Sequence, residues 1–301
     1  MIKVAGIQMA CSEDKERNVE KAFRLACLAA DRGARIICFQ ELFHTHWFPK
    51  EIDRESFDLA EPFDGPTVEA IRPLARDKDV VLICPIFEKD SEGGFYNSAT
   101  VIDAGGEIAG VYRKVHVPQI PLWEERSYFA PGNTGLTVFP TSHGRIGIQI
   151  CWDNFFPEGT RCLALKGAQI VFSPTAAAFA SQDRWQTMIR ANALANGVYI
   201  MRVNRVGSEK RQDFYGQSFC VGPDGEVVAG PSGMKEGIVF ADVDFSEIGR
   251  YRKEYPFLSD RRPTTYRDIC DPALPLPQTS QEIERQEIAG QGGSPSMLRR
   301  H

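Results

Sequence analysis

Apolar residues in the first third of the chain recur at spacings that change from one segment to the next. Residues 2–9 alternate as in a strand, whereas residues 13–31 place Val19, Ala22 and Ala26 at helical spacing. Gly33 follows this second segment and is expected to end the helix. The same pattern predicts a strand, a helix and a strand over residues 35–40, 67–76 and 80–87.

Turn signals then mark two hairpins. The sequence AGGE at 104–107 separates residues 96–103 from 108–114, and PDG at 223–225 separates residues 217–222 from 226–229. Short Gly-containing turns between β-rich runs are typical of hairpins. The remaining segments are predicted as strands over 136–139, 145–150, 169–173, 198–203 and 238–243 and as helices over 157–166 and 183–195.

Each half of the chain therefore contains β-α-β units followed by a hairpin. Alternation of this kind implies an α/β fold in which helices cover the faces of sheets, and the repeated order hints at internal pseudo-symmetry. Residues 1–270 are predicted to form a single domain. Residues 271–301 are rich in Pro, Gln, Gly, Ser and Glu with little apolar periodicity, so we expect an extension that is mobile or lies across a partner subunit.

Composition narrows the classes of protein that the chain can be. Its 301 residues are 43% apolar and 25% charged, which is typical of a globular protein and excludes disordered and fibrous classes. The net charge is −5 without a Lys/Arg cluster, so no nucleic-acid partner is expected. No apolar stretch is long enough for a membrane span and no secretory signal is evident, so no membrane association is predicted.

The eight cysteines indicate a compartment. They show no CxxC pair and no zinc-type Cys/His spacing, and most of them lie in apolar runs. Reduced thiols in a cytoplasmic protein are therefore predicted, and no bound metal is expected.

The most informative stretch surrounds Cys151. The predicted strand at 145–150 runs into this cysteine, and a helix is expected to begin near Pro157, because proline suits the first helical turn. A thiol at such a bend has the position of a nucleophile elbow. Backbone N–H groups and the helix dipole there are expected to favour the thiolate. A buried structural cysteine is the alternative.

A cysteine hydrolase also needs a base and a group that stabilises the oxyanion. The five histidines show no His/Asn or His/Asp partner pattern, so a papain-like arrangement is not supported. Two charged residues instead follow apolar strands, Glu41 in FQELF and Lys114 in YRKVHVP. Charged residues at strand ends in an α/β protein point toward a crevice, and a solvated strand end is the alternative for each alone.

Together these segments resemble the nitrilase, or carbon–nitrogen hydrolase, superfamily. The motifs FQEL, YRKVHVP and GIQICWDNFFPE stand in the family order, and the resemblance covers about residues 1–270. It implies a four-layer αββα sandwich with Glu41 as general base, Lys114 as stabiliser of the tetrahedral intermediate and Cys151 as nucleophile. A second family glutamate is matched by Glu125, with the adjacent Glu124 as the alternative. The family also implies a homodimer or a higher homo-oligomer.

These groups can hydrolyse a non-peptide C–N bond, and the chemistry requires no cofactor. Glu41 takes the thiol proton and Cys151 attacks the carbon, while Lys114 and a backbone N–H near Trp152 offset the developing charge. Glu41 then protonates the leaving nitrogen, which departs as ammonia or an amine, and activates the water that hydrolyses the thioester.

The small-molecule substrate is suggested by the residues around the nucleophile. CWDNFFPE, SPTA and NRVG most resemble the N-carbamoylputrescine amidase branch, which implies a ureido substrate, an N-carbamoyl amine. The stretch after Thr175 lacks the acidic loop expected there in that branch. Asn154 and Phe155 stand where the D-amino-acid carbamoylase branch has two arginines that hold a carboxylate. A carbamoyl amine or neutral amide is therefore expected to react better than an N-carbamoyl amino acid of similar length.

Aromatic residues near the motifs favour an apolar or aryl-bearing substrate, with core packing as the alternative. We predict that the substrate is contacted by Trp152, Trp47, Trp123, Phe155 and Thr175. Two other interpretations stay open, namely an aliphatic or aryl amidase or nitrilase of the same superfamily and an inactive small-molecule binding protein. A dinucleotide-dependent oxidoreductase is disfavoured because no GxGxxG follows the first strand.

Overall fold

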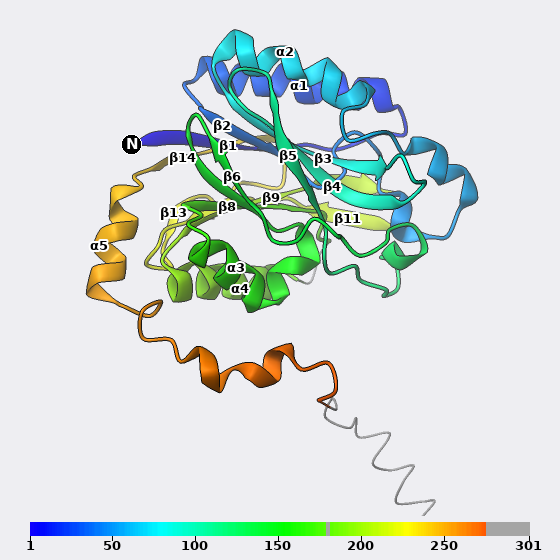
Figure 1. Ribbon diagram of the computed structural model, residues 1–301. Helices are drawn as coiled ribbons and strands as arrows, with labels where there is room; N and C mark the ends of the chain where they lie inside the picture. The colour runs from blue at the N-terminus through cyan, green and yellow to red at the C-terminus, as the bar shows by residue number, and fades with distance from the viewer. Residues whose placement is uncertain (179–180, 275–301) are drawn as a thin grey trace, which may run out of the picture. The chain divides into compact units, whose positions relative to one another are not determined.

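Two six-stranded sheets face each other at the centre of the fold (Figure 1). The computed structural model describes residues 1–178 and 181–274, and a first unit, Met1–Ser259, is separate from the residues that follow. The first sheet consists, in spatial order, of β14 (Gly237–Val243), β1 (Ile2–Gln8), β2 (Ile36–Phe39), β3 (Val81–Lys89), β4 (Phe95–Ile102) and β5 (Ile108–Arg113). The second consists of β13 (Val227–Ala229), β12 (Phe219–Val221), β9 (Tyr199–Asn204), β8 (Ile170–Thr175), β7 (Gly144–Ile148) and β6 (Val138–Thr141).

Helices cover the outer face of each sheet. The helices α1 (Lys15–Asp31) and α2 (Pro66–Lys78) lie on the first sheet, and α3 (Pro157–Leu165) and α4 (Gln182–Asn196) lie on the second (Figure 1). Small side chains of α1, among them Ala22 and Ala26, pack against Ile37 of the first sheet. The four-layer αββα sandwich that the sequence predicts is therefore confirmed.

The two sheets repeat one topology. In the first, β1, β2 and β3 are parallel and α1 and α2 connect them, and in the second, β7, β8 and β9 are parallel with α3 and α4 between them. An antiparallel pair follows each set, β4–β5 in one sheet and β12–β13 in the other. Parallel strands need such crossovers, so the repeated β-α-β pattern expected from the sequence becomes two sheets of equivalent order.

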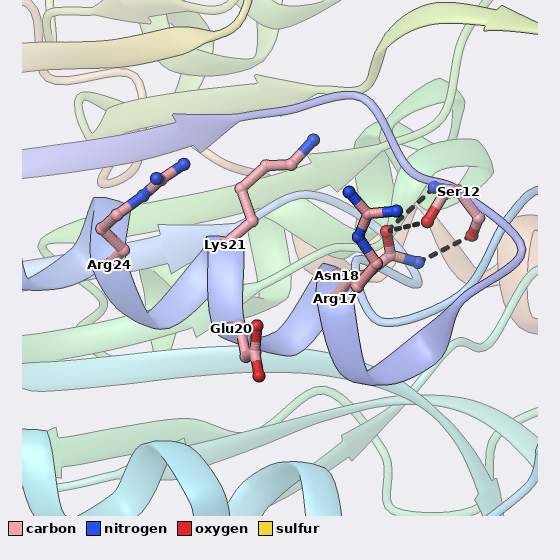
Figure 2. A pocket seen from close by; sticks show the side chains of 6 residues that line it. All are labelled: Ser12, Arg17, Asn18, Glu20, Lys21 and Arg24. Atoms are coloured by element: carbon pink, nitrogen blue, oxygen red, sulfur yellow. Dashed lines mark hydrogen bonds between the residues drawn. The ribbon is translucent and has the colours of Figure 1, made fainter.

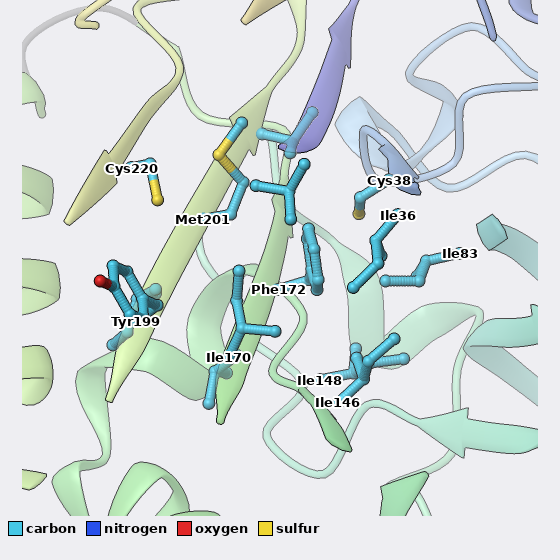
Figure 3. Close-up of a cluster of buried hydrophobic side chains, with 14 of the residues drawn as sticks. Ile36, Cys38, Ile83, Ile146, Ile148, Ile170, Phe172, Tyr199, Met201 and Cys220 are labelled. Atoms are coloured by element: carbon cyan, nitrogen blue, oxygen red, sulfur yellow. The ribbon is translucent and has the colours of Figure 1, made fainter. Parts of the chain in front are cut away.

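The principal core lies between the sheets. Ile36 and Ile83 of the first sheet point toward Ile148, Phe172 and Met201 of the second (Figure 3). All five side chains are fully buried, and burial of a side chain of this size contributes roughly 1.5–3 kcal/mol. Most of the apolar runs read from the sequence therefore serve the contact between the sheets.

Gly6 of β1 leaves space for side chains of the facing sheet. A Cβ atom at this position would lie 2.8 Å from Val203 Cγ2 and 2.9 Å from Met201 Cε, both on β9. Glycine is used here because the facing side chains occupy the space of a side chain.

All the predicted strands and helices are present, with ends that differ by a few residues, but several elements were not expected. A separate hairpin of β10 (Val206–Glu209) and β11 (Gln212–Tyr215) was missed, because its turn contains Lys210 with φ of 51° in place of the usual Gly or Asn. The helix α5 (Ser246–Glu254) was missed because only Ile248 and Tyr251 of its side chains are buried. Short 3₁₀ helices cover Phe48–Lys50, Arg54–Leu59, Glu125–Ser127 and Cys151–Phe155.

A second unit of the chain begins at Asp260. Residues 260–274 contain two short 3₁₀ helices, Pro263–Thr265 and Arg267–Cys270. Residues 275–301 lie outside the described residues, so the domain boundary at 270 and the extension beyond it stay predictions. None of the described helices is both long enough and apolar enough to cross a membrane.

Gly6→Val should destabilise the protein, because the new side chain must displace Val203 and Met201. Overpacking of this kind costs about 1–3 kcal/mol, measurable as a loss of free energy of unfolding in a urea titration. Gly249→Ala in α5 is the matched control, since no atom lies within 4 Å of its Cβ position, and helix propensity should stabilise it by up to about 1 kcal/mol. Wild-type stability of Gly6→Val would contradict this account of the sheet contact.

Candidate active site

Glu41, Lys114 and Cys151 all lie just beyond the ends of strands. Glu41 and Lys114 follow β2 and β5 of the first sheet, and Cys151 follows β7 of the second. All three side chains are buried, and so is Glu125 in the 3₁₀ helix Glu125–Ser127. The facing sheets thus bring together four residues that are far apart in the sequence.

The ammonium of Lys114 lies between two carboxylates. Its Nζ atom is 2.9 Å from Oε1 of Glu41 and 2.6 Å from Oε2 of Glu125. Burial by itself lowers the pKa of Lys114, but the negative charges of Glu125 and Glu41 outweigh burial and raise the pKa above its ordinary value. Lys114 is therefore a permanent cation at neutral pH.

Glu41 has one occupied and one free carboxylate oxygen. Oε1 accepts hydrogen bonds from Lys114 Nζ and, at 2.8 Å, from Nδ2 of Asn97 on β4. Oε2 is buried and has no hydrogen-bond partner among the described residues. This oxygen is consequently available to accept a proton. Asn97 was missed in the sequence, where a single asparagine inside a strand carries no signal.

The structure places Glu125 at the site in preference to Glu124. Glu125 is fully buried and binds Lys114, whereas Glu124 is partly exposed and accepts a hydrogen bond from Gln119. Burial raises the pKa of Glu125 above its ordinary value; Lys114 opposes this shift, and the charge of Glu41 adds to it. Two close carboxylates therefore coexist because one of them holds a proton more strongly than usual.

Cys151 begins the 3₁₀ helix Cys151–Phe155 with φ of 44°, a left-handed conformation that is uncommon for a residue with a side chain. Glu41, Lys114 and Glu125 all act on it electrostatically. Burial raises the pKa of the Cys151 thiol well above its ordinary value, Glu41 adds to this, and Lys114 and a hydrogen bond to the backbone of Ala176 oppose it. Burial and the two nearby carboxylates thus act against the thiolate that the local backbone and Lys114 favour.

Asp153 connects the cysteine turn to the lysine segment. Its Oδ2 accepts hydrogen bonds from Tyr112 Oη at 2.6 Å and from the Ile150 N–H at 3.0 Å. Its Oδ1 accepts one from the His116 N–H at 2.9 Å. Since Tyr112 and His116 flank Lys114 and Ile150 precedes Cys151, one buried carboxylate sets the spacing of the two reactive segments.

Arg205 holds the backbone around Glu41. Its guanidinium donates hydrogen bonds to the carbonyl oxygens of Glu41, Leu42 and Thr45 at 2.8–3.2 Å and pairs with Glu209 at 2.6 Å. The side chain is fully buried. Arg205 directly follows β9, so a residue of the second sheet positions a loop of the first.

Gly132 fits the chain against the lysine segment. Its N–H donates to the carbonyl oxygen of Lys114 at 2.8 Å, and a Cβ atom would lie 2.0 Å from the carbonyl oxygen of Arg113. Only glycine can occupy this position without moving the backbone that carries Lys114.

An apolar cavity of about 580 Å³ opens at Cys151. Three of the predicted substrate-contacting residues, Trp123, Trp152 and Phe155, line it, together with Ala176–Ala178 and Trp185.

A second hollow on α1, lined by Ser12, Asn18, Lys21 and neighbours, contains none of the predicted residues, and Asn18 there bonds to Ser12 (Figure 2). The described residues contain no group of three or more His, Cys, Asp and Glu side chains that could hold a metal.

Two predicted substrate contacts are not supported by this geometry. Trp47 is fully buried, packs against Trp123 and Phe214, and does not line the cavity. Thr175 is fully buried in β8, where its hydroxyl donates to the Ser173 carbonyl at 2.9 Å. Their closeness to the motifs in sequence did not show which way the side chains point.

Comparison with known proteins gives a consistent result. A family model described as carbon-nitrogen hydrolase matches residues 3–253. N-carbamoylputrescine amidase from Solanum lycopersicum is 38% identical over 283 residues, which cover 89% of this chain and 94% of that protein. Citrullinase from Francisella tularensis subsp. tularensis is 36% identical over 280 residues, covering 89% of this chain and 98% of that protein.

Solved structures agree with these relatives. A carbon-nitrogen hydrolase from Helicobacter pylori G27 has a TM-score of 0.86 and 35% identity, covering 91% of this chain and 99% of that one. A mutant amidase from Nesterenkonia sp. AN1 has a TM-score of 0.74 and 25% identity, covering 89% and 96%. In that structure the acetamide moiety of fluoroacetamide is covalently added at the active-site cysteine.

Asp153→Ala should both destabilise the protein and slow turnover. It leaves the Tyr112 hydroxyl and two backbone N–H groups without their acceptor, at about 1–3 kcal/mol for each group that stays unpaired. It also frees the cysteine turn, and a displacement of about 1 Å in a reacting group costs roughly 10²-fold in rate. Urea unfolding and kcat measure the two effects. Tyr112→Phe, which removes one of the hydrogen bonds, is the milder control; wild-type kcat in Asp153→Ala would refute the positioning role.

Proposed function

The chain belongs to the carbon–nitrogen hydrolase family, and on this premise we propose that it hydrolyses the ureido group of an N-carbamoyl amine through Cys151, with release of ammonia. The observation that carries the proposal is the buried Lys114 ammonium between Glu41 and Glu125, all within electrostatic reach of Cys151 at the end of an apolar cavity. Relatives named N-carbamoylputrescine amidase and citrullinase support a C–N bond of a ureido-type substrate.

The first half-reaction forms a bond between sulfur and the ureido carbon. Burial and the nearby carboxylates favour the protonated thiol of Cys151, and Glu41 removes its proton through the unpartnered Oε2 as the sulfur attacks. The carbonyl oxygen takes the electron pair, and the adjacent Lys114 cation stabilises this charge. Glu41 then returns the proton to the terminal nitrogen, the C–N bond breaks and ammonia leaves. A carbamoyl thioester on Cys151 remains.

Water completes the reaction. Glu41 accepts a proton from water, which attacks the thioester carbon, and the thiol leaves with that proton. The carbamic acid released loses carbon dioxide to give the free amine. The sum is one ureido group and one water converted into amine, carbon dioxide and ammonia, with Glu41, Lys114 and Cys151 regenerated.

Glu125 has a positioning and electrostatic role in this scheme. It accepts a hydrogen bond from Lys114, and Lys114 in turn donates one to Oε1 of Glu41. Because Oε1 is occupied in this way, only Oε2 is free to exchange protons. The apolar walls at Trp123, Trp152 and Phe155 exclude water around the carbonyl and contact the carbon chain of the substrate.

The proposal can be tested by measuring ammonia release and its dependence on the Cys151 thiol. Cys151→Ala should abolish ammonia release from N-carbamoylputrescine and other alkylureas, because the covalent step is lost. Circular dichroism and the urea midpoint should stay those of the wild type. Acetamide, benzamide and an alkyl nitrile complete the panel; release of ammonia only from these would replace the ureido substrate by an amide or a nitrile. Release from none of them would favour a binding protein, and full activity in Cys151→Ala would reject the mechanism.

Lys114→Met in the same assay separates intermediate stabilisation from substrate binding. Loss of one such group typically costs about 3–4 kcal/mol in the transition state, or roughly 10²–10³-fold in kcat. KM should change little if Lys114 acts on the intermediate. A large rise in KM with unchanged kcat would instead indicate that Lys114 binds the substrate in the ground state.

We also propose a cellular compartment and an oligomeric state for the protein. A nucleophilic thiol must stay reduced, and all eight cysteines are free, which supports the cytoplasm. Exposed apolar side chains on α3, α4 and β13, namely Leu165, Leu194, Val227 and Val228, support a homodimer or a larger homo-oligomer through these elements.

Light scattering should therefore give at least twice the chain mass of 33.6 kDa at micromolar concentration. Leu194→Glu should shift the distribution toward monomer, because a buried unpaired carboxylate is costly, whereas Ile52→Glu, an exposed apolar residue outside these elements, should not. A monomer in the wild type would refute the proposed assembly.

A further inference from the structure

The described residues that line the cavity at Cys151 carry positive charge only. Its walls are mostly aromatic and aliphatic, and Arg184 is the one charged side chain among the described residues that line it. No aspartate or glutamate is among those lining residues. A substrate that extends from Cys151 along this cavity therefore meets positive charge and no described acidic group.

Arg184 is available to bind a ligand. It lies in the first turn of α4, is exposed, and makes no ion pair or hydrogen bond with another described residue. Arg190 on the same helix is different, since it donates to the Gly225 carbonyl and pairs with Glu226. A guanidinium that lacks a protein carboxylate at the edge of a cavity is suited to a carboxylate of the substrate.

A second arginine lies next to a residue of the cavity wall. Arg202 of β9 is fully buried, and its guanidinium lies 4.6 Å from the ring of Trp185, which lines the cavity. Its side chain forms no ion pair with a carboxylate among the described residues; the guanidinium donates one described hydrogen bond, to Tyr215 Oη at 2.9 Å, and Nε has no partner. It also acts electrostatically on Cys151. A buried cation without a counter-ion is costly, so an anion in the cavity would offset that cost.

We propose that the ureido substrate carries a carboxylate at the end of its carbon chain, recognised by Arg184 and favoured by the buried charge of Arg202. The proposal rests on the proposed function, since it concerns the other end of the same substrate. An apolar spacer would lie along the tryptophans, and the ureido group would reach Cys151. In these apolar surroundings an ammonium group at the distal end is disfavoured by the same two cations.

The position of the carboxylate is distal and not α to the ureido nitrogen. The Nδ2 atom of Asn154 already donates to the carbonyl oxygens of Gln149 and Cys151, and Phe155 is apolar. Neither can hold an anion beside the nucleophile, as the sequence indicated. The tertiary structure adds the two arginines from α4 and β9, which revises the expected preference for uncharged or amine-bearing chains.

Three compounds of matched length test the proposal with the full-length protein: 4-ureidobutyrate, butylurea and N-carbamoylputrescine, which end in a carboxylate, a methyl and an ammonium group. Ammonia release gives kcat/KM for each. The wild type should rank them in that order, with 4-ureidobutyrate about tenfold above butylurea, the lower end for a hydrogen bond to a charged group.

Substitutions of the arginines test which residue causes the preference for the carboxylate-bearing substrate. Arg184→Gln should reduce the ratio of kcat/KM between 4-ureidobutyrate and butylurea about tenfold, and Arg184→Glu should move N-carbamoylputrescine above 4-ureidobutyrate. Arg190→Gln is the matched control on α4 and should keep the wild-type ratio. Arg202→Lys should keep most of the ratio and Arg202→Gln should lower it, whereas a purely structural role would slow all three compounds equally in both variants.

Each outcome decides a specific statement. Equal kcat/KM values for the three compounds, or a wild-type preference for N-carbamoylputrescine, would overturn the carboxylate proposal and leave the ureido reaction standing. An unchanged ratio in Arg184→Gln would remove Arg184 as the recognition residue. Absence of ammonia from all three compounds would overturn the proposed function and this proposal with it.

Discussion

The ion pairs of Lys114 with Glu41 and Glu125 are the interactions on which the rest of the site depends. Three fully buried ionisable groups share a small volume with a thiol, at N–O distances of 2.9 and 2.6 Å. Without the ammonium, two carboxylates would face each other away from water, which is unfavourable unless one is neutralised. With it, one oxygen of Glu41 is held by Lys114, and the other oxygen has no hydrogen-bond partner among the described residues.

Such an arrangement constrains the fold, because its members come from strand ends in different sheets. The facing sheets supply the approximate positions, and buried polar contacts make them specific. Asp153 joins the cysteine turn to both sides of Lys114, Arg205 holds the backbone of Glu41, and Gly132 packs against the backbone at Lys114. Each of these contacts crosses between segments that are distant in sequence, so the site is stable only when the whole sandwich has formed.

The charged residues near Cys151 fall into two sets. The first set is Glu41, Glu125 and Lys114, to which we assign proton transfer and stabilisation of the intermediate. The second set is Arg184 of α4, which lines the aromatic cavity, and Arg202 of β9, which contacts the ring of Trp185. Under the two proposals, proton transfer and recognition of the distal end of the substrate are carried out by separate residues.

From periodicity and turn residues, which are local signals, the sequence predicted nearly every strand and helix. Its three ordered motifs, through their resemblance to the family, implied the αββα sandwich and pointed to Glu41, Lys114 and Cys151, with Glu125 or Glu124 as the fourth residue. It did not determine the protonation of Cys151, the use of Asn97, Asp153 and Arg205 as supports, or the absence of Trp47 and Thr175 from the described cavity wall. Those properties depend on which side chains meet after the sheets have packed, and on how much water is excluded there. Burial and contact between distant segments are tertiary quantities, and they set the direction in which the pKa of Cys151 is shifted and the charge of the residues that line the cavity.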